Sequence, residues 1–285
     1  MDQRSELSEF LRSRRARLKP EDVGLRDHGR HRRVPGLRRE ELAQLAGVSV
    51  AYYTRLEQGN AQNVSVEVLD AIGRALRLND IEQDHLTHLA KGKAKKKRAA
   101  ACRPQQVRPA LQQLMDSMDH VPAHLIGRRL DILGWNRMAA ALLGDMSQLP
   151  PQERNLARHV FLDPASRSLY VDWHGKAIDV VSILRLCAGC YPNDPQLTAL
   201  VGELSVKSEE FRTMWAAHTV AEKGHGVRRL RHPVVGELTL AYETLKLPDE
   251  HDLSLVTFHA EPGSASEESL RLLGSWSADQ PVRTG

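Results

Sequence analysis

The side chains best suited to specific recognition lie between residues 50 and 58 of this 285-residue chain. A helix that begins after Ser49 would turn by about 100° per residue, which gathers short and polar side chains on one face. That face carries Val50, Ala51, Thr54, Arg55 and Gln58. An arginine can donate two hydrogen bonds to one guanine, and small apolar side chains can contact a thymine methyl group. The face therefore has the chemistry to read base pairs in a major groove.

Two short helices and a tight turn must position this face, within the stretch RREELAQLAGVSVAYYTRLEQG at 38–59. Gly47 stands where a helix end favours a left-handed residue, and Ser49 is a suitable N-cap for the second helix. The inward-facing residues are predicted to be Leu42, Leu45, Ala46, Tyr53 and Leu56. The pattern predicts a helix-turn-helix, because the Gly-Val-Ser turn and the basic flanks disfavour an ordinary helical hairpin in a bundle.

Residues around these two helices could contact the phosphate backbone of DNA. The candidates are Arg32, Arg33, Arg38, Arg39, Tyr52, Thr54 and Asn60. Glycines and a proline predict a loop at 24–36, whose arginines form either a phosphate-contacting arm or a merely solvated segment. Tyr52 is either a phosphate contact or a core residue, and Glu57 is interpreted as structural.

Charge is distributed unevenly along the chain. Residues 1–103 contain 22 Lys and Arg against 14 Asp and Glu, a balance of +8, whereas the remainder contains 18 against 22, a balance of −4. This asymmetry favours a polyanion partner for the N-terminal part alone. The chain has no apolar run near the roughly 20 residues that span a bilayer, and its N-terminus does not resemble a secretory signal. Three cysteines and no targeting segment suggest a reduced cytoplasm, with no membrane partner.

The apolar periodicity predicts an α+β protein in which residues 1–92 form an all-α, five-helix DNA-binding domain. Residues 93–103 are a lysine-rich linker, 104–278 a second domain, and 279–285 a tail. In the second domain we expect antiparallel strands with flanking helices. The expected helices cover 107–118, 136–143, 150–161, 164–189 with a break near 174–175, 195–204, 208–218 and 266–276. The expected strands or hairpins cover 123–135, 236–247 and 253–259.

Two groups of motifs resemble known families. The stretch 38–59, with VPGLRREELA at 34–43, resembles the Xre (lambda-repressor-like) helix-turn-helix family. The C-terminal half is similar to the MmyB-like ligand-binding domain, a PAS-like fold of bacterial regulators, and five segments carry this resemblance. They are RRLDILGWN at 128–136, ERNLARHVFLDP at 153–164, LYVDWH at 169–174, VGELSVKSEEFRTMWAAH at 201–218 and HPVVGELTLAYETL at 232–245.

The resemblance implies a bacterial transcription regulator that senses an apolar, fatty-acid-like effector and requires no cofactor. It implies base reading by Val50, Ala51 and Arg55, and a backbone contact by Arg39. Many relatives carry glutamine at the first two of these positions, so the apolar pair argues against amide readout of adenine.

A PAS-like pocket would be lined by bulky side chains on the strands and on the helices above them. The aromatic candidates are Trp135, Phe161, Trp173, Phe211, Trp215 and Tyr242. The polar candidates for a carboxylate headgroup are Asn136, Arg154, Asn155, Arg158 and His218. The alternative is that the aromatic residues are ordinary core and the arginines a solvated helix face.

Two further interpretations of the C-terminal domain remain open from the sequence. The domain could bind another protein instead of a small molecule, or it could be an enzyme. Cys187 and Cys190 form a CxxC, with Gly189 as the expected helix C-cap, but no second cysteine pair completes a zinc site. No nucleotide-binding or hydrolase motif occurs, so we expect no catalytic residue and no metal.

Paired DNA half-sites favour a homodimer.

Overall fold

The computed structural model describes residues 3–25, 36–91, 107–218, 224–248 and 250–278. The chain forms two compact units. The first contains residues 1–100 with 182–202 and 213–222, and the second contains 101–181, 203–212 and 223–285. The predicted fold class is confirmed: an all-α N-terminal region is followed by an antiparallel sheet with flanking helices. None of the described helices is both long enough and apolar enough to cross a membrane.

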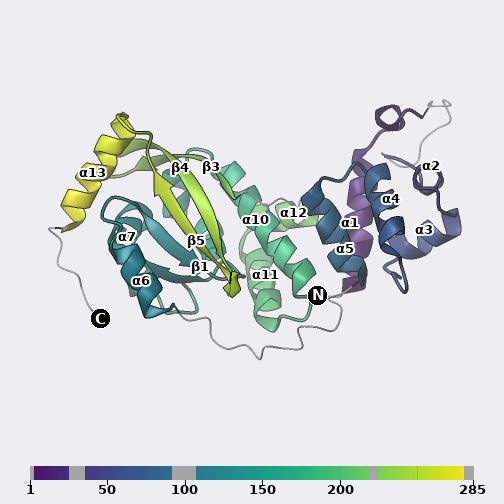
Figure 1. Ribbon diagram of the computed structural model, residues 1–285, viewed down its shortest axis with the longest axis horizontal. Helices are drawn as coiled ribbons and strands as arrows, with labels where there is room; N and C mark the ends of the chain where they lie inside the picture. Colours follow the sequence, from purple (N-terminus) through teal and green to yellow (C-terminus); the bar gives the residue numbers. More distant parts are fainter. Residues whose placement is uncertain (1–2, 26–35, 92–106, 219–223, 249, 279–285) are drawn as a thin grey trace. The chain divides into compact units, whose positions relative to one another are not determined.

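The first unit contains the five predicted N-terminal helices, drawn in purple and blue in Figure 1. They are α1 (Gln3–Arg17), α2 (Arg39–Leu45), α3 (Val50–Glu57), α4 (Val66–Ala75) and α5 (Asp80–Lys91). One apolar core joins them, and its fully buried members include Phe10, Leu42, Tyr53, Ile72 and Leu86. Burial of this shared core stabilises short helices that would be marginal in isolation.

One expectation about the first unit's helix faces is wrong, and one burial was not predicted. Arg14 and Arg15 of α1 are buried, and Arg14 pairs with Glu82 at 3.0 Å. Leu45 does not complete the inward stripe of α2, because 37% of it is exposed and Ala43 is buried instead. Periodicity identified both helices, but the neighbouring helices decided which flank of each became core.

The second unit is built on a five-stranded antiparallel sheet within the described residues. Its strands are β1 (Ala123–Ile126), β2 (Ile132–Trp135), β3 (His225–His232), β4 (Gly236–Leu247) and β5 (Glu250–His259), in the order β2-β1-β5-β4-β3. β1 and β2 confirm the predicted hairpin at 123–135. β3 was not predicted, because its sequence HGVRRLRH lacks a regular apolar alternation. It is an edge strand of the described sheet that pairs with β4, and its Leu230 also forms an isolated bridge with Tyr170.

Helices surround this sheet. The helix α6 (Pro109–Asp116) packs on β2, α7 (Arg137–Leu143) packs on β1, and α13 (Ala265–Ala278) packs on α7 and β4 (Figure 1). The chain also forms α8 (Leu156–Leu162), α9 (Pro164–Leu169), α10 (Trp173–Cys190), α11 (Pro195–Lys207) and α12 (Glu209–Ala216). The last three contribute residues to both units.

Three predicted helix boundaries in this region are wrong. The helix expected to begin at 150 begins at Leu156, because Pro150 and Pro151 lie in a turn and Asn155 supplies the N-cap. The expected break near 174–175 lies earlier, between Leu169 and Trp173. Gly189 is not a C-cap, since α10 continues through it to Cys190.

Candidate DNA interface and effector pocket

The helix α3 presents the predicted recognition face. The Oγ atom of Ser49 accepts a hydrogen bond from the backbone N of Tyr52 at 3.1 Å, and Gly47 before it has a φ of +65°. Val50, Ala51, Arg55 and Gln58 are exposed and Thr54 is half-buried. Tyr53 and Leu56 are buried on the opposite side, as predicted. The cap and the core contact therefore hold the N-terminal turn of α3 outward in one orientation.

Glu57 anchors this helix to two others. Glu57 is 1% exposed. Its carboxylate accepts hydrogen bonds from Arg15 Nε at 2.7 Å, from Arg39 Nε, and from the Tyr53 hydroxyl at 3.3 Å. Two guanidinium groups compensate the buried charge, which an unpaired carboxylate could not tolerate. The structural interpretation of Glu57 is thus confirmed. Arg39 remains 45% exposed, so its remaining N–H groups face solvent near the start of α2.

The other candidate phosphate contacts occupy different environments. The backbone N of Arg38 donates to Glu41 at 2.7 Å at the start of α2, and its side chain is half-buried. Tyr52 is half-buried against the helical core, whereas Asn60 is exposed after α3. Arg32 and Arg33 lie outside the described residues, so their role as an arm stays a prediction.

A small apolar pocket lies in the second unit, among the β1–β2 hairpin, α7 and α8. It is lined by His124, Ile132, Trp135, Ala139, Leu143, Gly144, Met146, Leu156, His159 and Tyr170. Its volume of about 20 Å³ holds roughly one water molecule, whereas ligand pockets typically measure about 300–1,000 Å³. The pocket is therefore too small in this conformation for such a ligand.

The pocket is polar only at a few points. Burial lowers the pKa of His124 to about 3 and also lowers that of His159, and the positive charge of Lys176 acts in the same direction on both. Burial also lowers the pKa of Lys176 to about 8 and raises that of Tyr170 to about 12. Near neutral pH both imidazoles are thus uncharged, beside a lysine that is mostly charged.

Of the expected aromatic residues, Trp135 lines this pocket. Phe161 instead stacks edge-on against Trp173 and Phe211, at ring distances of 5.7 and 5.1 Å. Tyr242 lies near the ring of Phe258, at 6.2 Å. Trp215 belongs to the first unit, where the Arg185 guanidinium lies 3.9 Å from its ring centroid.

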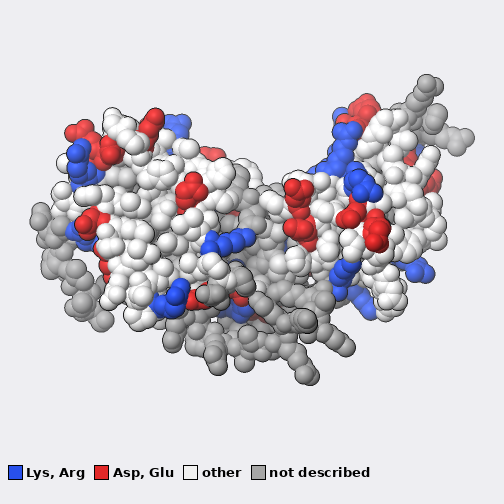
Figure 2. Space-filling view, viewed as in Figure 1, with Lys and Arg blue, Asp and Glu red and all other residues white. Residues whose placement is uncertain are grey.

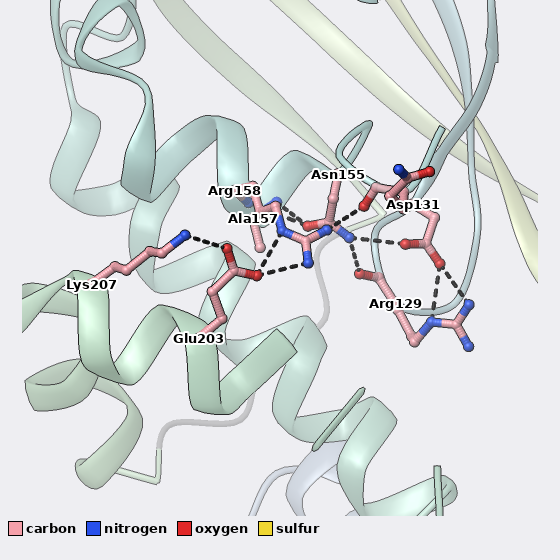
Figure 3. Close-up of polar contacts among 8 residues, drawn as sticks. Arg129, Asp131, Asn155, Ala157, Arg158, Glu203 and Lys207 are labelled. Atoms are coloured by element: carbon pink, nitrogen blue, oxygen red, sulfur yellow. Dashed lines mark hydrogen bonds and ion pairs between the residues drawn. The ribbon is translucent and has the colours of Figure 1, made fainter. Parts of the chain in front are cut away.

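The expected polar residues hold the backbone of the second unit together. Asn136 is buried, caps α7 through Ala139 N and donates to three carbonyl groups. Asn155 caps α8 and donates a hydrogen bond to Asp131 (Figure 3). Nε and Nη2 of Arg158 donate to Oε2 of Glu203 at 2.9 and 2.7 Å. Arg154 donates to the carbonyl groups of Leu149 and Ser147. His218 lies in the first unit, with Nε2 2.8 Å from Glu9.

Sequence reasoning did not single out His124, His159 or Lys176. His124 follows Ala123 in an apolar strand, and His159 lies between Arg158 and Val160, so neither belongs to a recognisable motif. A polar residue next to an apolar position was the only available signal, and it does not distinguish a pocket from an ordinary core.

The CxxC pair lies at the end of α10. Cys187 is buried and Cys190 half-buried, and no disulfide joins them. No group of His, Cys, Asp or Glu within the described ranges is arranged to hold a metal ion. Gly189 between them lies against His85, where an added Cβ would come within 2.5 Å of the ring.

Family comparisons match both halves of the chain. The model of the MmyB-like transcription regulator ligand binding domain matches residues 107–273. The chain belongs to this family. A helix-turn-helix domain model matches residues 6–86. The chain therefore combines a DNA-binding domain with a ligand-binding domain, as a ligand-responsive transcription regulator does. No curated protein matches the chain.

The described surface has no single dominant basic patch on the face drawn in Figure 2, where Lys and Arg are interspersed with Asp and Glu.

Proposed function

We propose that the protein reads its operator with Val50, Ala51 and Arg55, and holds the DNA backbone with Arg38, Arg39, Tyr52, Thr54 and Asn60. The outward N-terminal turn of α3 carries this proposal, because those three side chains are exposed on one capped and anchored helix. Arg39 is fixed by Glu57 and lies at the N-terminus of α2, where the helix dipole favours a phosphate. Arg32 and Arg33 would extend the backbone contact.

Two arginine variants separate base reading from backbone contact. Arg55→Ala should lose about 1–3 kcal/mol of discrimination at one base pair, because a bidentate contact to guanine is removed. Arg39→Ala should weaken binding to all sequences alike. Gel shifts over operators carrying single-base changes, taken from DNA selected out of a random pool, measure both effects.

The matched control is Arg74→Ala, which removes an exposed arginine of α4 outside the motif. We expect little change in its sequence profile. Identical base profiles for the Arg55 and Arg39 variants would refute the division of roles.

We infer that the effector is an apolar, fatty-acid-like molecule that enters the pocket beside Trp135. The apolar lining supports this class, and the pocket must widen to admit an acyl chain. Gly144, with a φ of +100°, joins α7 to the segment containing Met146 and is well placed to allow that movement. The remaining expected effector residues of the second unit do not line the pocket and would act by holding its walls in place. Trp215 and His218 lie in the first unit and have no part in this proposal.

A bulky substitution tests the pocket. Leu143→Trp should fill it from the half-buried rim and reduce fatty-acid affinity at least tenfold, while DNA binding without effector persists. Leu149→Trp is the control, since Leu149 is 39% exposed and does not line the pocket. Calorimetric titration with decanoate measures the difference, and equal losses in both variants would contradict the location.

The alternative is a DNA-bound regulator whose C-terminal domain binds another protein. The small volume of the pocket supports this alternative, because it does not admit a fatty acid as it stands. Native mass spectrometry of protein purified from cells separates them, because a co-purifying lipid supports the effector role and a stoichiometric protein partner supports the other.

A bacterial, cytoplasmic homodimer is the assembly we propose on DNA. Two recognition helices reading paired half-sites lie about 34 Å apart. Sedimentation with a selected operator should therefore show two chains for each duplex, and one chain for each duplex would exclude the paired arrangement.

A further inference from the structure

Two histidines that line the pocket have buried nitrogen atoms without hydrogen-bond partners among the described residues. These atoms are Nδ1 of His124 and Nε2 of His159. His124 is 4% exposed and stacks on Phe258 at 5.8 Å. A buried polar atom without a partner costs about 1–3 kcal/mol, so two of them around one cavity point to a ligand group that supplies the missing bonds.

The hydrogen-bonding state of His159 follows from its other nitrogen. Nδ1 lies 3.1 Å from Oδ2 of Asp163, one turn further along α8, so Nδ1 carries the hydrogen and donates to this carboxylate. Nε2 of the neutral ring is therefore an acceptor. A ligand at this point must bring a hydrogen.

A cation lies near one of the residues that line the pocket. The Lys176 ammonium, from the first turns of α10, is 5.6 Å from the ring centroid of Tyr170, which lines the pocket. No ion pair of Lys176 exists among the described residues. The charged and titratable groups around His159 are Asp163 at the end of α8, His124 on β1, and Tyr170 and Lys176. Lys176 is itself influenced by the opposing charges of Arg228 and Asp179.

We propose that the polar end of the effector is a carboxyl group that binds between His124 and His159 and shares one proton with Nε2 of His159. The inference rests on the effector role proposed for the pocket. The free acid is ionised above about pH 5. Because His159 is neutral in the empty pocket, the shared proton must come from solvent. The carboxylates of Asp163 and of the ligand would together place negative charge in an apolar site. The positive charge of Lys176 offsets it.

Proton uptake gives binding a distinctive pH dependence. Between pH 6 and 7.5, below the Lys176 pKa of about 8, the Kd of decanoate should rise by up to about tenfold per pH unit. The Kd of 1-decanol should stay constant, since it brings its own hydrogen. Calorimetric titration of the full chain at several pH values measures both.

The deciding variant is His159→Gln, whose amide N–H can bind a carboxylate without taking up a proton. It should keep decanoate binding and lose the pH slope. His174→Gln, an exposed histidine of α10 that does not line the pocket, should keep the wild-type slope.

Three outcomes would overturn the inference. A pH slope that persists in His159→Gln, or tighter binding of decanol than of decanoate at pH 6, would exclude the shared proton while leaving the pocket's effector role intact. Failure of the wild-type protein to bind either probe would overturn the fatty-acid-like effector class as well.

Discussion

At the residue scale, His124 makes the second unit sensitive to acid. Its pKa lies near 3 in the folded protein, mainly because it is buried, against an ordinary value of 6.5. The unfolded chain therefore binds the proton first as the pH falls. The contribution of His124 to the free energy of unfolding is complete above about pH 6.5. It is lost as the pH falls towards 3, at about 1.4 kcal/mol per pH unit.

We predict that His124→Phe makes the free energy of unfolding less dependent on pH, because the variant lacks the imidazole that takes up a proton. The substitution keeps an aromatic ring against Phe258. The measurement is the free energy of unfolding by urea between pH 4 and 7, and the slope of the variant should be the shallower one. His174→Phe, at an exposed position, is the control and should follow the wild-type protein. Parallel curves for wild-type and His124→Phe would show that His124 does not titrate in this way.

At the scale of elements, the serine caps link helix formation to DNA reading. Ser49 caps α3 and Ser65 caps α4, each through a hydrogen bond to a backbone N three residues later, at 3.1 and 3.3 Å. Ser49→Ala and Ser65→Ala should each lower the free energy of unfolding by about 1 kcal/mol.

Only Ser49→Ala should also weaken operator binding, because its cap precedes Val50 and Ala51 directly. Thermal unfolding and gel shifts on the same two variants provide a matched comparison. If Ser65→Ala weakened DNA binding as much as Ser49→Ala, overall stability rather than the position of α3 would explain both losses.

At the scale of the whole molecule, α10 contributes to both compact units, with residues up to 181 in one and from 182 in the other. In the first unit, Arg185 is 1% exposed and its Nη1 lies 2.6 Å from Oε2 of Glu6 in α1. Its Nη2 donates to the carbonyl of Trp215. Burial raises the pKa of Glu6, although the charge of Arg185 opposes this.

Arg185→Met should lower stability by about 3–5 kcal/mol at pH 7, since it leaves a buried carboxylate without its partner. The loss should shrink as the pH falls, because Glu6 can then take up a proton. Arg212→Met is the control: its pair with Glu209 spans 3.6 Å on an exposed surface and should contribute less than about 1 kcal/mol. Denaturant midpoints of both variants at pH 5 and 7 test this, and equal losses would contradict the role of Arg185.

Local chemistry determined a large part of this protein from the sequence alone. Helix periodicity, the Ser49 cap and the Gly47 turn act over a few residues, so they predicted α1 to α5, the recognition face and the buried Tyr53. The hairpin at 123–135 followed from apolar alternation in the same way. Family resemblance added the ligand-binding domain, which composition does not reveal.

Only the tertiary structure decided which polar residues became buried and what they contact. Glu6 and Arg185 are 179 residues apart, and the pocket joins His124, His159 and Tyr170 from three separate segments. Such contacts depend on how distant elements pack, and burial then sets the protonation of each group. For that reason the sequence alone did not indicate that Asn155 and Arg158 bind Asp131 and Glu203, or that two uncharged imidazoles line the pocket.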